Sequence, residues 1–367
     1  MGLIVQKYGG TSVKDAERVM NVARRITDAY KAGNNVVVAV SAQGDTTDDL
    51  IEKAKEINPN ASKREMDMLL STGEQISISL LAMAIEKIGC PVISLTGWQA
   101  GVKTDAKYGA ARISTIDTER LQAELDKKNI VIVAGFQGIN KYDDITTLGR
   151  GGSDTSAVAL AAALHADVCE IYTDVDGVYT ADPRFVKNAY KLDDISYDEM
   201  LELASLGANV LHNRSVEMAK KYGVKLSVRS SLNNNEGTYV KEVEQVEKML
   251  VRGVTRDNDV ARIALCGVED TPGKAFSVFR MLAKHGISVD SQSVTVKRKT
   301  LALLLRKKIY SLYLTFLKKT RQSLRLTKLN GQRTFQRFLL SVREWLITQA
   351  LPLQCLRLFT MHTSTSI

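Results

Sequence analysis

The chain has 367 residues and a formal net charge of +9, all of which comes from residues 297–367, because the preceding 296 residues carry a net charge of −5. This length allows two or three domains, and the acidic main body gives no support for nucleic-acid binding. Scattered cysteines and histidines without zinc-site spacing, together with the lack of an 18-residue apolar run or leader pattern, predict a cytoplasmic protein with no transition-metal site and no membrane association.

Apolar runs and amphipathic stretches alternate along the first 240 residues. The pattern predicts strands at 3–5, 35–41, 91–95, 130–134, 168–173 and 225–229. Helices are expected between them, one with apolar spacing from Val19 to Ile26 and others at 77–87, 118–127, 156–163, 197–203 and 211–222. This alternation indicates a mainly parallel sheet with helices on both faces, in which ligands bind at the carboxyl ends of the strands.

The first predicted strand leads directly into residues 7–12, with the sequence KYGGTS, and a helix is expected next. A strand, a glycine-rich turn and a helix N-terminus together form a phosphate site, in which backbone N–H groups face the anion. The lysine precedes the glycines, so this is not a Walker A loop. A solvent-exposed lysine at the end of the strand is the alternative interpretation of Lys7.

A second glycine-rich segment, residues 148–156, has the sequence LGRGGSDTS and precedes a run of small residues. Its glycines allow the backbone to approach an anion, and a helix predicted to start near Ser153 or Asp154 directs its positive end to the same place. Arg150 suits a carboxylate or a phosphate, and Asp154 suits Mg2+ or a lysine. We interpret the segment as an anion site, with a tight strand-to-helix turn as the alternative.

The pattern changes after residue 240. Residues 241–255 look like a charged linker, followed by a predicted strand at 260–265, a turn at 271–273, a helix at 275–285 and a strand at 287–289. This order is half of a small βαβ-type domain. Residues 297–367 are basic and rich in leucine, and they show no sustained helical or alternating period, so the sharpest boundary in the chain lies before them.

Six motifs in order resemble the aspartate kinases of the amino-acid kinase superfamily. They are residues 7–13 (KYGGTSV), 38–48 (VAVSAQGDTTD), 71–75 (STGEQ), 134–138 (AGFQG), 149–155 (GRGGSDT) and 173–184 (TDVDGVYTADPR). Residues 272–290 resemble the first half of an ACT regulatory domain. The resemblance implies a three-layer α/β/α sandwich with a mainly parallel sheet over residues 1–240, a linker at 241–255 and a partial ACT (βαβ) domain at 256–296.

The resemblance also implies an activity. ATP, with Mg2+, would phosphorylate the β-carboxylate of L-aspartate to 4-phospho-L-aspartate, the first step of lysine (through diaminopimelate), threonine and methionine biosynthesis. Lysine and threonine would act as effectors at the ACT region, and the intact family form would be a homo- or hetero-oligomer. Lys7 would neutralise the transferring phosphoryl group, and Asp154 would orient Lys7 or Mg2+.

The family resemblance assigns further residues to the two ligands. The ATP site would comprise Lys7, Gly9, Gly10, Ser12, Ser41, Thr173, Asp174, Tyr179, Asp182 and Arg184. The aspartate site would comprise Thr47, Glu74, Phe136, Arg150, Gly151, Gly152 and Ser153, and no residue is assigned as a protein ligand of a metal. In this scheme Arg150 would bind the α-carboxylate of aspartate, Glu74 would bind its ammonium group, and Phe136 would form a wall of the pocket.

Several of these residues have simpler interpretations. Glu74 could be an acid at a helix N-terminus that complements the dipole. Asp174 and its neighbours could form only a turn, and Tyr179 and Phe136 could be ordinary core aromatics. Two other functions stay open: a superfamily enzyme that acts on glutamate, acetylglutamate or carbamate, and a non-catalytic sensor of lysine or threonine.

The C-terminal residues match neither the rest of an ACT domain nor a second one. If the third base of each codon is taken with the first two of the next, and synonymous codons are chosen freely, residues 299–310 can be read as DISFTVAKKDL and residues 343–367 as GMADYPGVAAAMFEALYNAHININ. Both readings resemble the expected ACT segments, in family order. We therefore hypothesise a frameshift near residues 294–299, and expect impaired feedback, poor solubility and no packed structure beyond about residue 297.

Overall fold

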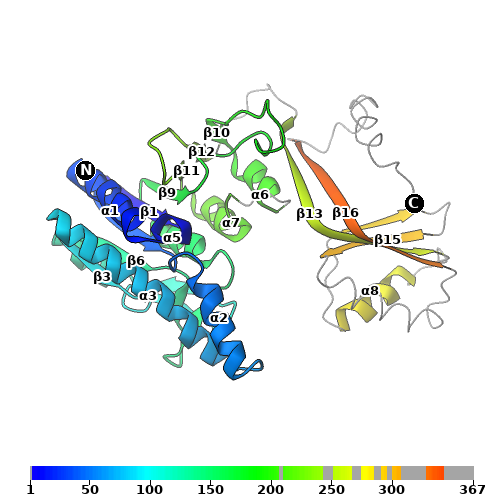
Figure 1. The fold of residues 1–367 in the computed structure, drawn as a ribbon, viewed down its shortest axis with the longest axis horizontal. Helices are drawn as coiled ribbons and strands as arrows, with labels where there is room; N and C mark the ends of the chain where they lie inside the picture. Colours follow the sequence, from blue (N-terminus) through cyan, green and yellow to red (C-terminus); the bar gives the residue numbers. More distant parts are fainter. Residues whose placement is uncertain are drawn as a thin grey trace. The chain divides into compact units, whose positions relative to one another are not determined.

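The computed structural model describes residues 2–205, 210–242, 251–266, 274–284, 291–295, 300–306 and 328–342 (Figure 1). These residues form two compact units. The described residues up to Gly253, with Ser341 and Val342, form one unit, and the described residues from Val254 to Leu340 form the other. The candidate site lies entirely in the first unit.

The first unit is built on an eight-stranded sheet in the order β10-β12-β11-β9-β1-β2-β6-β3. Every pair of neighbours is parallel except β11 and β12, so the expected mainly parallel sheet is confirmed. The strands are β1 (Leu3–Tyr8), β2 (Asn35–Val40), β3 (Val92–Leu95), β6 (Ile130–Ala134), β9 (Val168–Thr173), β10 (Asp194–Ile195), β11 (Leu226–Ser230) and β12 (Thr238–Val240). Lys7 of β1 is in register with Ala39 of β2 and Ile171 of β9.

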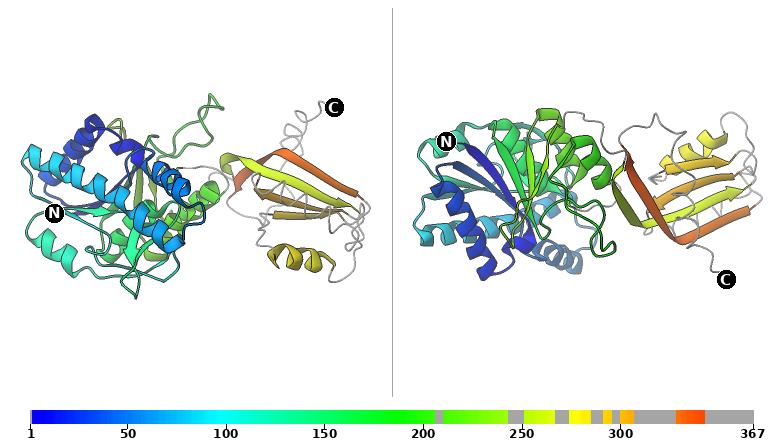
Figure 2. Two further views of the ribbon diagram at one scale, coloured as in Figure 1. Left: turned by 60° about the horizontal axis from the view of Figure 1, so that its bottom comes forward. Right: turned by 90° about the horizontal axis from the view of Figure 1, so that it is seen from above.

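Helices cover both faces of this sheet, which confirms the three-layer arrangement (Figure 2). One face packs against α1 (Ala16–Lys31) and α3 (Lys63–Ile88), and the other against α4 (Glu119–Asp126), α5 (Gly152–Ala163), α6 (Tyr197–Ser205) and α7 (Asn213–Tyr222). The short η1 (Gly10–Val13) follows β1, and α2 (Thr46–Ile57) follows β2. Strand β2 is buried on both sides because its side chains alternate: Val36 and Val38 belong to the α1 and α3 core, and Val37 and Ala39 to the α5 core.

Helix α3 is much longer than the predicted segment 77–87. It begins at Lys63, where the Ser62 side chain caps the helix by accepting a hydrogen bond from the Glu65 N–H. Its first half buries polar residues, including Asp67 and Glu74, and these interrupt the apolar period on which the prediction depended. By length and composition α3 could cross a membrane, but half of its most apolar window is buried in this unit, as in the core helix of a globular domain.

A second, four-stranded sheet lies in the same unit, in the order β5-β4-β7-β8. Its strands are β4 (Val102–Thr104), β5 (Ile113–Ile116), β7 (Gln137–Ile139) and β8 (Ile145–Thr147). They have three or four residues each, which is too short for an alternating pattern to be recognised in the sequence. This small sheet leads directly into the segment that contains Arg150.

The second unit has a four-stranded sheet in the order β14-β15-β13-β16 and the helix α8. Its elements are β13 (Val251–Cys266), α8 (Lys274–Lys284), β14 (Ser291–Thr295), β15 (Thr300–Arg306) and β16 (Lys328–Val342). The expected helix is present, with Val278 and Leu282 buried. Because β13 begins at Val251, the end of the expected 241–255 linker belongs to a strand.

Residues 300–306 correct one expectation of the sequence analysis. The sequence predicted no packed element beyond residue 297, yet β15 pairs antiparallel with both β13 and β14. An apolar, β-branched-poor stretch can still complete a sheet, because the ladder uses backbone groups that every residue carries. The predicted turn at 271–273, the predicted strand at 287–289 and residues 307–327 and 343–367 lie outside the described residues.

Candidate active site

The two glycine-rich segments meet at a largely buried ion pair. Lys7 lies near the end of β1, and Asp154 lies in the first turn of α5, which begins after Gly151 in the left-handed conformation at φ 69°. Lys7 Nζ is 2.6 Å from Asp154 Oδ1, and each side chain is only 13% exposed. This burial contradicts the solvent-exposed interpretation of Lys7, and it places a positive charge at the N-terminus of α5, where an anion is favoured.

The turn after β1 is packed too closely to accept a side chain at Gly10. A Cβ at this position would lie 2.5 Å from the backbone oxygen of Ala42, so the loop after β2 touches the turn directly. A Cβ at Gly9 would lie 3.5 Å from Lys7 Nζ. The Ser12 N–H donates to the Gly9 carbonyl at 2.9 Å, which closes the 3-10 turn of η1. The backbone of this turn therefore lies beside the lysine ammonium group.

Ser231 is a residue of this region that the sequence analysis missed. The Ser12 hydroxyl donates to Ser231 Oγ at 2.8 Å, and the Ser231 hydroxyl donates to the Thr173 carbonyl at 3.2 Å. These bonds join the turn after β1 to the carboxyl ends of β9 and β11. The only signal in the sequence was that Ser231 lies shortly after the predicted strand at 225–229, at the edge where ligands of parallel sheets bind.

Phe136, after β6, has a backbone conformation that bulky residues rarely adopt. Its φ is 67°, in the left-handed region. The Phe136 N–H donates to Ser156 Oγ at 3.0 Å, and its carbonyl accepts from the Leu148 N–H at 2.8 Å, so α5 and the segment after β8 hold it in place. A Cβ at Gly152 would lie 2.7 Å from the Phe136 ring. Phe136 is half-buried and borders the second glycine-rich segment, which differs from an ordinary core aromatic.

Glu74 is a buried carboxylate with an unused oxygen. Its Oε1 accepts the Ala42 N–H at 3.1 Å, while its Oε2 is buried and has no hydrogen-bond partner among the described residues. Burial raises the pKa of Glu74 from its ordinary value of 4.5 to about 7, an effect that the Ala42 N–H partly offsets. Since Glu74 lies in the middle of α3, the alternative of an acid at a helix N-terminus is wrong.

The other predicted residues of the aspartate site lie on the second glycine-rich segment and in the first turn of α2. Arg150 is exposed, and no described residue pairs with its guanidinium group. Ser153 is 8% exposed and packs against Gly135, where a Cβ would lie 2.9 Å from its hydroxyl. Thr47 is half-buried in the first turn of α2. Arg150 is therefore available to bind an anion, and Ser153 packs closely against the residue that follows β6.

The predicted nucleotide residues are divided between the sheet edge and a separate loop. The Ser41 N–H donates to the Tyr8 carbonyl at 3.1 Å, and the Thr173 hydroxyl donates to Asp174 at 3.0 Å. In the following loop several contacts join residues that are close in the chain. The Tyr179 hydroxyl donates to Asp176, and Arg184 forms an exposed ion pair with Asp182 at 2.8 Å.

The role of Asp176 favours the turn interpretation for part of this loop. Its carboxylate accepts from both Tyr179 and Asn235, and these hydrogen bonds lower its pKa against the effect of burial. Tyr179 is half-buried, which does not fit an ordinary core aromatic. In the described part of the chain, no three His, Cys, Asp or Glu side chains lie together as metal ligands.

The sequence of this chain is similar to those of known kinases. A profile of the amino acid kinase family matches residues 2–230. The aspartokinase of Bacillus sp. (strain MGA3) is 56% identical over 291 residues, which are 79% of this chain and 71% of that protein. The aspartokinase of Corynebacterium glutamicum is 55% identical over 294 residues, which are 79% of this chain and 70% of that protein.

Solved structures give the same result. The crystal structure of the aspartate kinase from Synechocystis has a TM-score of 0.60 and 43% identity, over 92% of this chain and 59% of that one. E. coli aspartokinase III in complex with aspartate and ADP has a TM-score of 0.71 and 26% identity, over 90% of this chain and 85% of that one. The complex of that enzyme with lysine and aspartate has a TM-score of 0.74.

Proposed function

The chain belongs to the amino acid kinase family and, within it, to the aspartokinases, and from this membership we propose how its residues transfer the γ-phosphoryl group of ATP to L-aspartate. The product is 4-phospho-L-aspartate. The observation that carries the assignment of the site is the Lys7–Asp154 pair, 2.6 Å long, between two glycine-rich segments at one edge of a parallel sheet.

The reaction needs positioning and charge neutralisation more than it needs proton transfer. The β-carboxylate of aspartate is ionised at neutral pH, so it can attack the γ-phosphorus without a general base. Lys7 compensates the negative charge on the transferring phosphoryl group, and Asp154 holds the Lys7 ammonium group in place. The backbone N–H groups at Gly9 and Gly10 and the N-terminus of α5 bind phosphate oxygens.

Aspartate binds through its two charged α-substituents. The substrate ammonium group pairs with Glu74, whose buried Oε2 lacks a partner among the described residues. The α-carboxylate pairs with Arg150, which is exposed and unpaired within the described residues. Phe136, Thr47 and the segment 151–153 complete the pocket. These contacts leave the β-carboxylate free to point toward Lys7.

The nucleotide binds along the carboxyl ends of β2 and β9. Ser41, Thr173 and Asp174 lie at that edge, and Tyr179, Asp182 and Arg184 in the following loop complete the nucleotide site. Mg2+ fits as an ion carried by the ATP phosphates, because it keeps several waters and needs only one or two carboxylates. Asp154 and Asp174 are the carboxylates suited to it. When bound, Mg2+ neutralises phosphate charge.

A turnover assay with several acceptors tests this function. The protein is incubated with Mg-ATP and aspartate, and the acyl phosphate is trapped with hydroxylamine as a coloured hydroxamate. Aspartate-dependent hydroxamate is expected, with little product from glutamate, acetylglutamate or carbamate. Preference for one of those acceptors would indicate another superfamily enzyme, and binding of lysine or threonine without turnover would indicate a sensor.

The proposal extends to the role of the enzyme in the cell and to its regulation. The product would enter lysine, threonine and methionine biosynthesis in the cytoplasm. Lysine is an effector to test, since a complex of E. coli aspartokinase III contains lysine and aspartate. An oligomer is also expected.

We also propose that residues 256–296 are a partial ACT domain and that residues 297–367 are translated out of frame. The support is the composition of this region and the two frame-shifted readings of residues 299–310 and 343–367. Sequencing genomic DNA across codons 285–305 tests the idea. A single-base difference that restores the family frame is expected, and an unaltered frame would refute it.

A further inference from the structure

Two backbone segments are hydrogen-bonded to each other next to the start of the loop that contains Arg150. One is residues 109–111, in the connection between β4 and β5, and the other is residues 147–148, at the end of β8. The Ala111 N–H donates to the Thr147 carbonyl at 2.9 Å. Arg150 lies three residues after Thr147 in the chain. Contacts that hold these two segments in place therefore also hold the start of the loop that contains Arg150.

Asp67 of α3 holds both segments from one side. It is 1% exposed, and its carboxylate accepts three hydrogen bonds. The Thr147 N–H donates at 3.0 Å, the Thr147 hydroxyl at 2.6 Å and the Gly109 N–H at 2.8 Å. Bonds to a buried carboxylate are among the stronger hydrogen bonds in proteins, so Asp67 attaches both segments firmly to α3.

Arg214 of α7 holds the same two segments from the other side of the fold. Its guanidinium group donates to the Leu148 carbonyl at 3.0 Å and to the Ala111 carbonyl at 2.9 Å. Asp67 thus takes the N–H groups of the two segments, and Arg214 takes their carbonyls. The same end of α7 also touches the loop itself, because a Cβ at Gly151 would collide with the ring of His212.

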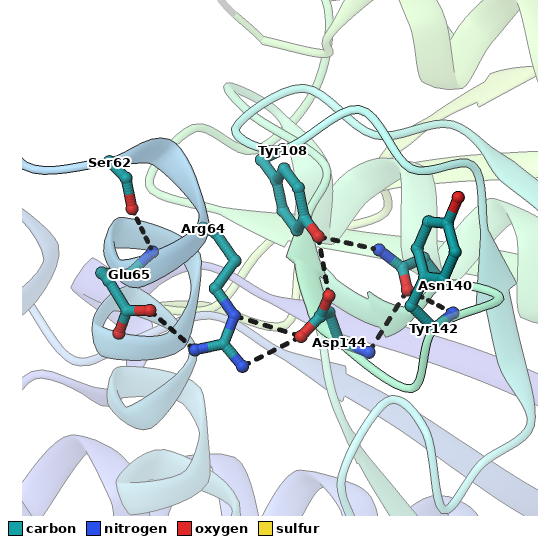
Figure 3. A network of polar contacts seen from close by, with 7 residues as sticks. All are labelled: Ser62, Arg64, Glu65, Tyr108, Asn140, Tyr142 and Asp144. Atoms are coloured by element: carbon teal, nitrogen blue, oxygen red, sulfur yellow. Dashed lines mark hydrogen bonds and ion pairs between the residues drawn. The ribbon is translucent and has the colours of Figure 1, made fainter.

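The contacts of α3 continue at its N-terminal end (Figure 3). Arg64 forms an ion pair with Asp144 at 2.9 Å, and the Tyr108 hydroxyl donates to the other oxygen of Asp144 at 2.7 Å. Tyr108 directly precedes Gly109, and Asp144 directly precedes β8. Arg64, Asp67 and Glu74 are three and seven residues apart, which places them along one face of the helix.

We propose that Asp67 and Arg214 are positioning residues that hold the Arg150 loop in register with Glu74, and so set the affinity for aspartate. The inference rests on the proposed function of Glu74 and Arg150. The loop needs such support, because Gly149 and Gly151 both have positive φ, at 75° and 69°, and glycines permit many other conformations. Without the two clamps Arg150 samples orientations in which it cannot reach the α-carboxylate.

The test uses Thr147→Val, which removes the hydroxyl donor to Asp67 and keeps the backbone N–H. Thr27→Val is the matched control, since Thr27 is equally buried and its hydroxyl donates to a backbone carbonyl within α1. In Thr147→Val the KM for aspartate is expected to rise about tenfold, the size of one strong hydrogen bond, with the KM for ATP changed less than about twofold. Thr27→Val should leave both unchanged.

Arg214→Lys is the second variant, because lysine cannot donate to two carbonyls in the same fork geometry. Arg214→Lys should also raise the KM for aspartate more than the KM for ATP. In the double variant with Thr147→Val, the increase should be smaller than the combined effect of the two single variants, because both substitutions act on the same two segments. The proposal would be overturned if Thr147→Val raised the KM for ATP as much as the KM for aspartate. It would also be overturned if Thr147→Val lost as much stability as Thr27→Val and left the KM for aspartate unchanged.

Aspartate binding, measured as the rise in melting temperature that aspartate produces, separates this proposal from the proposed function. If the unmodified protein does not bind aspartate, the proposed function and the positioning role are both refuted. If it binds aspartate and both variants bind equally well, only the positioning role is refuted. A smaller rise in melting temperature in both variants, with the ATP-induced rise preserved, supports it.

Discussion

Glu74→Gln tests the aspartate site most directly, because it removes a charge and keeps the shape. The carboxylate is 3% exposed, accepts the Ala42 N–H and has one oxygen without a described partner. In the proposed complex that oxygen accepts a hydrogen bond from the substrate ammonium group. Glutamine retains an acceptor for the Ala42 N–H, so the variant should fold. It cannot supply the negative charge that the ammonium group requires.

The magnitudes follow from the pKa. A pKa raised from 4.5 to about 7 means that ionised Glu74 is disfavoured in the native protein by about 3 kcal/mol. Between these two pH values the native state binds more protons than the unfolded state, so the free energy of unfolding falls as pH rises through this window. Glu74→Gln does not titrate there. Its stability relative to the unmodified protein should therefore increase between pH 5 and pH 8, by up to about 3 kcal/mol.

Aspartate binding should have the opposite dependence on pH. The ammonium group needs the ionised form of Glu74, so at pH 6 the KM for aspartate should be about tenfold higher than its value above pH 8. In Glu74→Gln the loss of a charge-assisted hydrogen bond should raise this KM roughly 10- to 100-fold at pH 8 and abolish its variation with pH. The KM for ATP should not change.

Steady-state kinetics from pH 6 to pH 8, with chemical unfolding at the same pH values, measure both effects. Glu86→Gln is the control, because Glu86 lies on the same helix and is exposed. An aspartate KM that stays near the unmodified value in Glu74→Gln, or one that is constant with pH in the unmodified protein, would refute the assignment of Glu74 to the ammonium group.

Four further substitutions have distinct expected outcomes. Lys7→Ala or Asp154→Ala should lower kcat by on the order of 100-fold or more while circular dichroism stays unchanged, and near-normal kcat in either would reject their roles. Arg150→Lys should raise the KM for aspartate more than that for ATP, because lysine cannot form a bidentate pair with a carboxylate; the reverse order would place Arg150 in the nucleotide site. Gly151→Ala should destabilise the protein by about 1–3 kcal/mol in thermal unfolding, since the methyl group meets the His212 ring and φ is positive, and an unchanged melting temperature would contradict this packing.

The sequence predicted the parts of the site that depend on local chain geometry. Lys7 and Asp154 each lie where a strand, a glycine-rich turn and a helix follow one another. The two strands, β1 and β8, belong to different sheets, and the Lys7–Asp154 ion pair joins the two turns. Asp67, Arg214 and Ser231 could not be predicted in this way. Their partners are 42 to 219 residues away in the chain, and nothing local marks a residue that hydrogen-bonds to a distant backbone.

In helix α3, buried polar residues made the first half of the helix hard to predict from the sequence, and the same residues indicate a candidate site. Hydrophobic periodicity recognises a helix by its apolar face, but the buried residues in the first half of α3 include Asp67, Ser71 and Glu74. The sequence therefore predicted only the second half of the helix. A burial of this kind is tolerated when the fold supplies partners, and so a polar face inside a core indicates either a structural network or a ligand.

The two buried carboxylates of α3 differ in how fully their hydrogen-bonding capacity is used. Asp67 accepts three donors from the fold, so its charge is already compensated and it has no need of a ligand. Glu74 is buried to a similar degree, but its Oε1 accepts a hydrogen bond from the Ala42 backbone N–H, and its Oε2 has no partner among the described residues. An unsatisfied buried oxygen costs free energy, and a protein retains it where a ligand restores the balance. This difference supports the proposal that Asp67 positions the site and that Glu74 binds the substrate.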